Sequence, residues 1–203
     1  HLAEISVQAL HSPRGALESP GPEWLRIAQL VIAADLVESA CNGPLICHGQ
    51  LSSQTMQARD RLIVAADLSS TAEIHALADD LRGIAGALKI GLQAFTANGP
   101  ELVREVIAAG HRVFLDLKLH DIPNTVQHAV REAGKLGIAM LTVHATGGAA
   151  MLGAARSQNT LILAVTVLTS LGEDDLDAIG LTGGASASVV RLAKLAAASG
   201  IRG

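Results

Sequence analysis

Short aliphatic runs recur between residues 62 and 165 at a nearly constant spacing. They start at about residues 62, 87, 113, 138 and 161, so the successive steps are 25, 26, 25 and 23 residues. A regular strand-helix repeat of this size predicts a parallel sheet built from β/α units. Five such units in series favour an α/β protein of the (β/α)8 TIM-barrel class, of which about the first five strands lie in this chain.

The boundaries follow from local patterns. The predicted strands cover residues 62–66, 87–90, 113–117, 138–143 and 161–165. Apolar residues at helical spacing predict helices over about 71–81, 100–110 and 124–137, the last capped by Asn124 and Thr125. A doubly wound open sheet is the alternative. That fold favours a Gly-rich phosphate-binding turn after its first strand, whereas this chain has Ala-Asp-Leu-Ser-Ser at residues 66–70.

The chain divides near residue 58. Residues 1–58 are an unassigned N-terminal extension, whose native origin is left open, and residues 59–203 form the predicted partial barrel. The extension holds both cysteines and the only Trp, and only residues 23–40 have a plausible helical length. We expect none of the missing strands in it. Residues 199–203 are typical of the approach to a sixth strand. Because a full barrel usually needs about 250 residues, we expect a fragment of a longer reading frame.

Composition and charge limit the classes of protein to which this chain can belong. The chain is 49% hydrophobic and 17% charged, with a net charge of -4. A basic stripe with interleaved aromatic residues is absent, so we expect no nucleic-acid partner. No run reaches the roughly 18 apolar residues of a membrane span, and the N-terminus lacks a signal-peptide pattern. Two cysteines fit a reducing compartment. These features predict a cytoplasmic protein. Cys41, Cys47 and His48 lack the spacing and the fourth ligand of a metal site, so no metal is expected.

Polar residues follow the predicted strands at the ends where β/α barrels carry their active sites. They are Asp67, Lys89, Asp116, Lys118, Asp121, His144, Thr169 and Ser170. Asp116 and Lys118 are two residues apart, so their side chains share one face of a strand. Charges this close must be paired, and they shift each other's pKa. The stretch 114–125 is therefore the strongest candidate for a catalytic strand end.

The decapeptide Asp-Leu-Lys-Leu-His-Asp-Ile-Pro-Asn-Thr at residues 116–125 resembles the signature of orotidine 5'-phosphate decarboxylases of the bacterial type. Further similar segments follow the same order at residues 65–67, 88–91, 142–148 and 164–170. The resemblance runs from about Arg61 to the last residue. It implies decarboxylation of orotidine 5'-phosphate to uridine 5'-phosphate in pyrimidine biosynthesis, without metal or organic cofactor.

The resemblance also implies roles for single residues. Lys118 would stabilise a carbanion at C6 of the pyrimidine and protonate it, and Asp116 would lie beside the substrate carboxylate. Lys89 and Asp121 would complete an alternating array of charges, with Asp121 reaching into the partner's site of a homodimer. The resemblance further implies substrate-binding roles for Asp67 and Lys89 at the ribose, Thr125 of the partner subunit near it, and Thr169 at the pyrimidine or the loop above it.

Two alternatives remain open. A Mg²⁺-dependent sugar-phosphate decarboxylase or aldolase of the same barrel type shares the Asp-x-Lys-x-x-Asp pattern. An inactive chain that only binds or associates is the other. The Leu-His-Asp-Ile-Pro-Asn-Thr continuation favours the nucleotide enzyme. His144 is expected to hold its strand end in place rather than to react.

Overall fold

The computed structural model describes residues 3–6 and 58–203. Six strands form one parallel sheet in the order β1-β2-β3-β4-β5-β6. The strands are β1 (Ala3–Ser6), β2 (Leu62–Ala65), β3 (Ala87–Gly91), β4 (Val113–Leu119), β5 (Met140–His144) and β6 (Leu161–Val165). A doubly wound sheet reverses its strand order at a switch point, and this sheet does not. The fold is therefore a partial (β/α)8 barrel.

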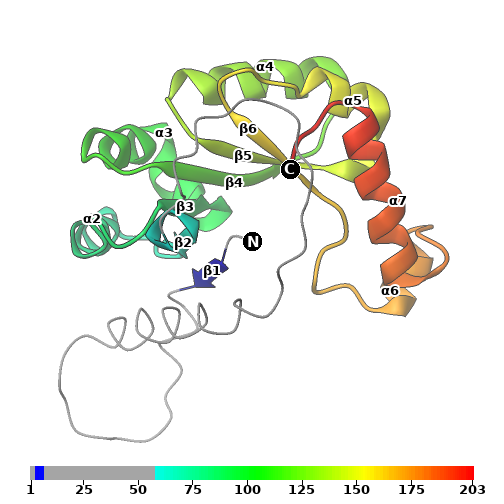
Figure 1. Ribbon diagram of the computed structural model, residues 1–203, viewed down its shortest axis with the longest axis horizontal. Coiled ribbons are helices and arrows are strands. Elements are labelled where there is room, and N and C mark those ends of the chain that lie inside the picture. The colour runs from blue at the N-terminus through cyan, green and yellow to red at the C-terminus, as the bar shows by residue number, and fades with distance from the viewer. Residues whose placement is uncertain (1–2, 7–57) are drawn as a thin grey trace, which may run out of the picture.

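Helices cover the outer, convex side of the curved sheet (Figure 1). They are α2 (Thr71–Asp80), α3 (Leu92–Ala108), α4 (Pro123–Lys135), α5 (Gly148–Ala154) and α7 (Gly184–Ala198), with short 3-10 turns η3 (Ala58–Arg61) and η4 (Ala145–Gly147). The short helix α6 (Glu173–Ala178) packs against α7. The sequence pattern did not predict α5, α6 or α7. None of the helices in the described part of the chain is long and apolar enough to cross a membrane.

The N-terminal extension contributes a strand, which contradicts our expectation. Residues of β1 pair in parallel with β2, from Ala3 opposite Leu62 to Ser6 opposite Ala65. Four residues with a single large apolar side chain, Ile5, are too short for an alternation to be recognised. The sheet accordingly has six strands instead of five. The predicted helix at 23–40 and the Cys41, Cys47 and His48 group lie outside the described residues.

Two helix starts also differ from prediction. α3 begins at Leu92 because two helical segments meet at Gly99, whose φ of 69° only glycine adopts readily, and Pro100 then starts the second segment. α4 begins at Pro123, and no side chain caps it. The predicted capping by Asn124 and Thr125 is wrong, since both lie inside the first turn, after a proline whose fixed φ already suits a helix start.

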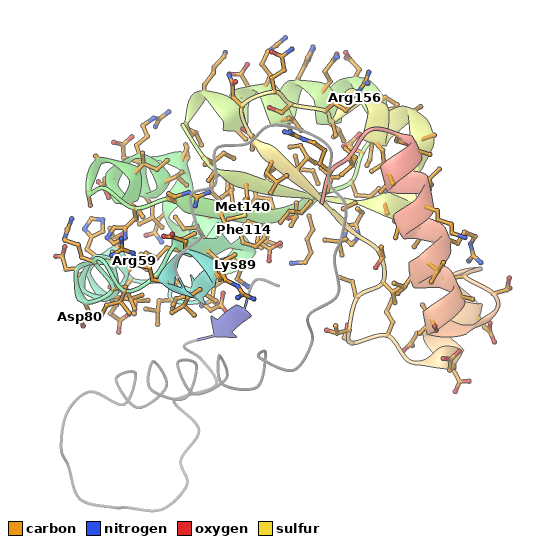
Figure 2. All side chains as sticks on the ribbon, in the orientation of Figure 1. Arg59, Asp80, Lys89, Phe114, Met140 and Arg156 are labelled. Atoms are coloured by element: carbon orange, nitrogen blue, oxygen red, sulfur yellow. The ribbon has the colours of Figure 1, made fainter. Side chains whose placement is uncertain are left out.

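Side chains alternate between the two faces of the sheet. The outward face packs under the helices and includes the fully buried Leu88, Ile90 and Leu115. The inward face carries a separate small cluster of Ile63, Ala87, Phe114 and Met140. Figure 2 shows Lys89, Phe114 and Met140 on the concave side of the sheet. Polar residues at inward positions are thus held inside the barrel.

The chain ends by pairing with β6. The backbone N–H of Ala164 donates to the carbonyl oxygen of Gly203 at 2.9 Å, and Ile201 is buried against the main core. The final residues therefore run beside β6, as expected for the approach to another strand.

Candidate active site

Three charged side chains meet at the carboxyl ends of β3 and β4. The ammonium nitrogen of Lys118 lies 2.9 and 2.8 Å from Oδ1 and Oδ2 of Asp116. The ammonium nitrogen of Lys89 lies 3.6 Å from Oδ2 of Asp116. The side chains of Lys89 and Asp116 are only 11% and 10% exposed, whereas that of Lys118 is 38% exposed. We name these three residues the charge cluster.

The backbone of β4 is irregular where the charge cluster forms. Pairing between β4 and β5 shifts register between Leu115 and Leu119. Among the described residues, Lys118 alone combines a side chain with a positive φ, at 51°. Such a conformation costs on the order of 1–3 kcal/mol and persists only where neighbouring structure enforces it. The strain lies at the residue that the sequence singled out for chemistry.

The buried residue Thr142 on β5 holds this irregular segment. Its hydroxyl donates to Oδ1 of Asp116 at 2.8 Å and accepts the backbone N–H of Lys118, also at 2.8 Å. The sequence patterns gave Thr142 no role. One signal was available, because Thr142 is a polar residue between Leu141 and Val143 in a strand whose only other polar residue is His144 at its end.

The pKa of Asp116 lies below its ordinary value. Burial by itself would raise that pKa, but hydrogen bonds from Lys118 and Thr142 and the positive charges of Lys118 and Lys89 together outweigh it. The carboxylate therefore stays ionised inside the barrel. An ionised acid flanked by two ammonium groups is a preorganised electrostatic device, because its charges need no rearrangement when a reaction begins.

Two histidines flank the charge cluster. The rings of His120 and His144 lie 5.5 Å apart between centroids. Burial lowers the pKa of His144, and the positive charges of His120 and Lys118 lower it further, against an opposing effect of Asp116. The sequence patterns gave His120 no role. His120 directly follows Leu119, the last residue of β4.

Asp67 follows β2 and lies beside the end of β3. A Cβ on Gly91 would stand 3.3 Å from Oδ1 of Asp67, so the absence of a side chain there leaves room for this carboxylate. Asp67 is half-buried at the same end of the sheet as the charge cluster. Its location is compatible with a substrate contact at the rim.

The other predicted site residues are exposed. Asp121 accepts a hydrogen bond from the backbone N–H of Ile122 at 2.6 Å, Thr125 lies in the first turn of α4, and Thr169 follows β6. Within the described residues, no hydrogen bond or ion pair joins any of the three to the charge cluster. All three nevertheless lie on the carboxyl side of the sheet.

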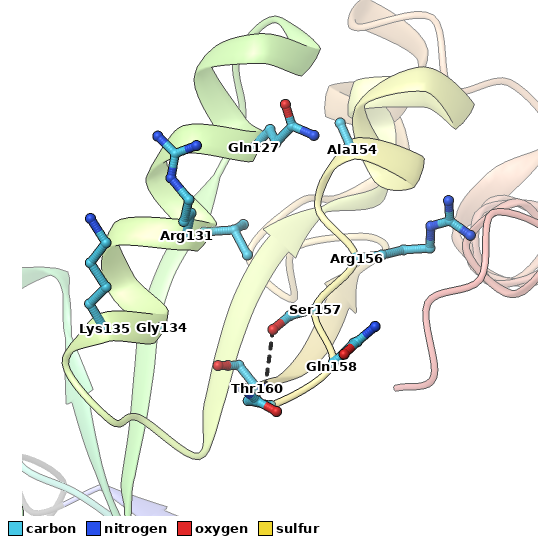
Figure 3. A pocket seen from close by; sticks show the side chains of 11 residues that line it. Gln127, Arg131, Gly134, Lys135, Ala154, Arg156, Ser157, Gln158 and Thr160 are labelled. Atoms are coloured by element: carbon cyan, nitrogen blue, oxygen red, sulfur yellow. Dashed lines mark hydrogen bonds between the residues drawn. The ribbon is translucent and has the colours of Figure 1, made fainter.

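A hollow of about 500 Å³ opens elsewhere, between α4 and the segment that joins α5 to β6 (Figure 3). Arg131, Lys135 and Arg156 line it, together with Ser157 and Thr160. Thr160 directly precedes β6, so the hollow lies at the amino ends of the strands, where barrels carry residues for stability. It is not part of the candidate active site.

Residues 59–203, whose side chains the structure describes, include no group of three His, Cys, Asp or Glu side chains placed to hold a metal ion. The bonded group at the carboxyl ends of β3, β4 and β5 consists of two lysines, one buried carboxylate and a threonine, with His120, His144 and Asp67 beside it.

The fold and the charge cluster define a β/α-barrel protein with an ionic site at the carboxyl ends of its strands. Residues 60–203 match the family "Orotidine 5'-phosphate decarboxylase / HUMPS family". The chain belongs to this family, as the motif at residues 116–125 indicated.

Similar curated proteins support membership of this family. An orotidine 5'-phosphate decarboxylase of Alkalilimnicola ehrlichii is 50% identical over 149 residues, which are 70% of this chain and 63% of that protein. One of Anaeromyxobacter sp. (strain K) is 48% identical over 151 residues, 73% of this chain and 66% of that protein. The chain therefore spans just under two thirds of the length of these relatives.

Solved structures share the fold. A crystal structure described as an uncharacterized conserved protein from Geobacillus kaustophilus has a TM-score of 0.64 and 36% identity, covering 70% of this chain and 71% of that one. The orotidine 5'-phosphate decarboxylase from Lactobacillus acidophilus has a TM-score of 0.63 and 33% identity, covering 68% and 67%.

Proposed function

We propose that this protein decarboxylates orotidine 5'-phosphate to uridine 5'-phosphate in pyrimidine biosynthesis, as a cytoplasmic carboxy-lyase without cofactor. One observation carries the proposal: Lys118 is held against Asp116 on the inner face of β4 at the carboxyl end of the barrel. Membership of the family and the names of its relatives support it.

The chemistry places a specific demand on the site. The bond between C6 and the carboxylate carbon breaks, its electron pair stays on C6, and CO₂ leaves. C6 has no neighbouring group that delocalises the pair, so stabilisation must come from fixed charges. The ammonium group of Lys118 answers this demand, because it stabilises the pair and then transfers a proton to C6, becoming a neutral amine.

Asp116 and Lys89 keep Lys118 ready. Asp116 attracts the ammonium group and fixes its position, and the lowered pKa of Asp116 keeps that carboxylate ionised. Lys89 balances the second oxygen of Asp116. In the proposed reaction the substrate carboxylate is placed beside Asp116. Repulsion between the two carboxylates is relieved when CO₂ leaves.

Asp121, Thr125 and Thr169 enter the proposal through the substrate and a second subunit. Asp121 and Thr125 are exposed in one chain, and Ile122 between them is 65% exposed. A second copy packed on this segment would remove the apolar side chain of Ile122 from water. The proposal includes a homodimer in which Asp121 and Thr125 reach the partner's substrate, with Asp67 and Lys89 at the ribose and Thr169 over the pyrimidine.

An ultraviolet assay of orotidine 5'-phosphate consumption tests the proposed function. We would assay the purified 203-residue chain beside the product of the complete reading frame that encodes it. Turnover that survives chelation supports the proposal. Activity that disappears with EDTA and returns with Mg²⁺ would favour the metal-dependent alternative. Absence of turnover in both polypeptides, with both folded, would contradict the proposed decarboxylation.

A further inference from the structure

The hydroxyl of Thr142 makes two hydrogen bonds whose directions are fixed. A carboxylate can only accept, so the hydroxyl proton points to Oδ1 of Asp116, and a backbone N–H can only donate, so the Lys118 amide points to the hydroxyl oxygen. Thr142 is 4% exposed, and solvent therefore cannot readily replace either bond. One side chain on β5 thus connects a backbone group and a side chain of two residues on β4.

The bond to the Lys118 amide falls where the strand ladder is interrupted. Leu115 pairs with Leu141 and Leu119 pairs with Val143, so the three residues 116–118 of β4 lie opposite the single residue Thr142 of β5. The amide of Lys118 donates to a side chain instead of a strand carbonyl, and its φ is 51°. A backbone N–H that is shielded from water and has no acceptor is destabilising. The hydroxyl of Thr142 supplies the acceptor and stabilises the left-handed conformation.

The bond to Asp116 fixes the other half of the ion pair. Oδ1 of Asp116 receives both the Thr142 hydroxyl and the Lys118 ammonium group, while Oδ2 faces the ammonium groups of Lys118 and Lys89. The carboxylate therefore has partners on both oxygens that restrict its rotation. Small displacements of a reacting group can reduce a rate by about 10²-fold. Because the restricted carboxylate holds the Lys118 ammonium group in place, loss of the restriction should lower the rate.

We infer that Thr142 is a positioning residue for the proposed decarboxylation, and that its hydroxyl holds Lys118 and Asp116 in one fixed arrangement. The inference rests on the proposed function for its effect on turnover. In this role Thr142 does not need to contact the substrate. Serine keeps the hydroxyl, so Thr142→Ser should preserve the arrangement. Valine has nearly the same shape as threonine but no hydroxyl, so Thr142→Val should disrupt it.

The experiment compares Thr142→Val and Thr142→Ser in the polypeptide that turns over orotidine 5'-phosphate. Thr160→Val is the matched control, because Thr160 is equally buried but lies at the opposite end of the sheet. We expect Thr142→Val to lower kcat by about 10²-fold with little change in KM, and Thr142→Ser to restore most of it. Equal kcat values for Thr142→Val and Thr160→Val would overturn the inference.

A second measurement keeps the inference separate from the proposed function. Hydrogen exchange of the Lys118 amide needs no turnover: Thr142→Val should accelerate it and Thr142→Ser should not. Wild-type protein without turnover, together with this exchange pattern, contradicts the proposed decarboxylation but upholds the positioning by Thr142. Unchanged exchange in Thr142→Val contradicts the positioning. Thr142→Ala, which adds no volume, replaces the valine variant should that variant not fold.

Discussion

The ammonium nitrogen of Lys118 contacts both carboxylate oxygens of Asp116, at 2.9 and 2.8 Å, although only one residue separates the two in the chain. Neighbouring inward positions on an extended strand hold side chains side by side, and the positive φ of Lys118 changes the direction in which its side chain leaves the backbone. The same backbone feature thus supports the ion pair and presents the ammonium group at the barrel rim.

Replacement of this ammonium group gives the most direct prediction. In a polypeptide that turns over orotidine 5'-phosphate, Lys118→Ala should lower kcat by about 10³-fold or more, since a preorganised charge aimed at the reacting atom is lost. The fold should survive, with a loss of about 1–3 kcal/mol from the broken charge-assisted bonds, because Lys89 still faces Asp116. Steady-state kinetics and urea unfolding measure the two effects.

Lys135→Ala is the control for that variant. Lys135 also contacts a carboxylate at short range, Glu132 at 2.7 Å, but on the exposed outer surface of α4. Its loss should leave kcat unchanged. Comparable activity of Lys118→Ala and Lys135→Ala would show that the short ion pair on β4 has no special part in the reaction.

Asp116 should make the stability of the protein depend on acid pH. Its pKa is lowered in the folded state, so its contribution is complete above the unfolded value of about 3.9 and is lost as pH falls through the lower folded-state pKa. Urea unfolding at several pH values should show wild type losing stability over this acid range. Asp116→Asn should lack that component.

Asp177→Asn serves as the comparison for this titration, because Asp177 is exposed on α6, away from the charge cluster. It should reproduce the wild-type profile. The same acid dependence in Asp116→Asn as in wild type would mean that other groups account for it and that the ion pairs of Asp116 contribute nothing measurable.

The regular spacing of aliphatic runs was enough to predict β2 to β6 and the barrel class, because strands buried on both faces must be continuously apolar. The short strand β1 escaped this argument, since its four residues carry no periodic signal. The position of β1 in the sheet is set by its pairing with the edge of β2. The sequence of the extension alone does not reveal that pairing. Only the second half of α3 was predicted, because Gly99 and Pro100 are typical of a helix start, whereas in the structure they form a kink within the helix.

The charge cluster was predicted from the alternation of side chains on one strand, and Lys89 from its position near the end of the preceding strand. The bonds of Thr142 could not be predicted in the same way. They depend on the register shift between β4 and β5 and on a left-handed lysine, and both arise from contacts between strands. No local preference of lysine favours that conformation.

Two histidines should reduce stability in weak acid. Burial lowers the pKa of both His144 and His111, assisted by His120 and Lys118 at the first and by Arg82 at the second. The unfolded chain therefore binds more protons below about pH 6.5, and stability that is complete above that pH is lost as pH falls through the folded-state values. Thermal unfolding between pH 7 and 5 should show this decline.

Single substitutions separate the two histidines. His144→Asn and His111→Asn should each remove part of the decline, and the double variant most of it. His128→Asn, at an exposed position on α4, should leave the profile unchanged. A wild-type stability that stays constant from pH 7 to 5 would contradict the prediction for both residues.

Gly86 should tolerate no side chain, because the turn before β3 passes against the backbone of η3. A Cβ at Gly86 would lie 2.6 Å from the carbonyl oxygen and 2.7 Å from the Cα of Asp60, and backbone atoms cannot move aside as a flexible side chain can. Gly86 also donates its N–H to Leu62 at the start of β2. Gly86→Ala should therefore cost about 1–3 kcal/mol in the free energy of unfolding.

Gly153→Ala on α5 is the control, since a Cβ there meets no atom within 4 Å, and it should raise stability by about 0.5–1 kcal/mol through helix preference. Urea unfolding of the two variants would contradict this account of the turn if both changed stability in the same direction.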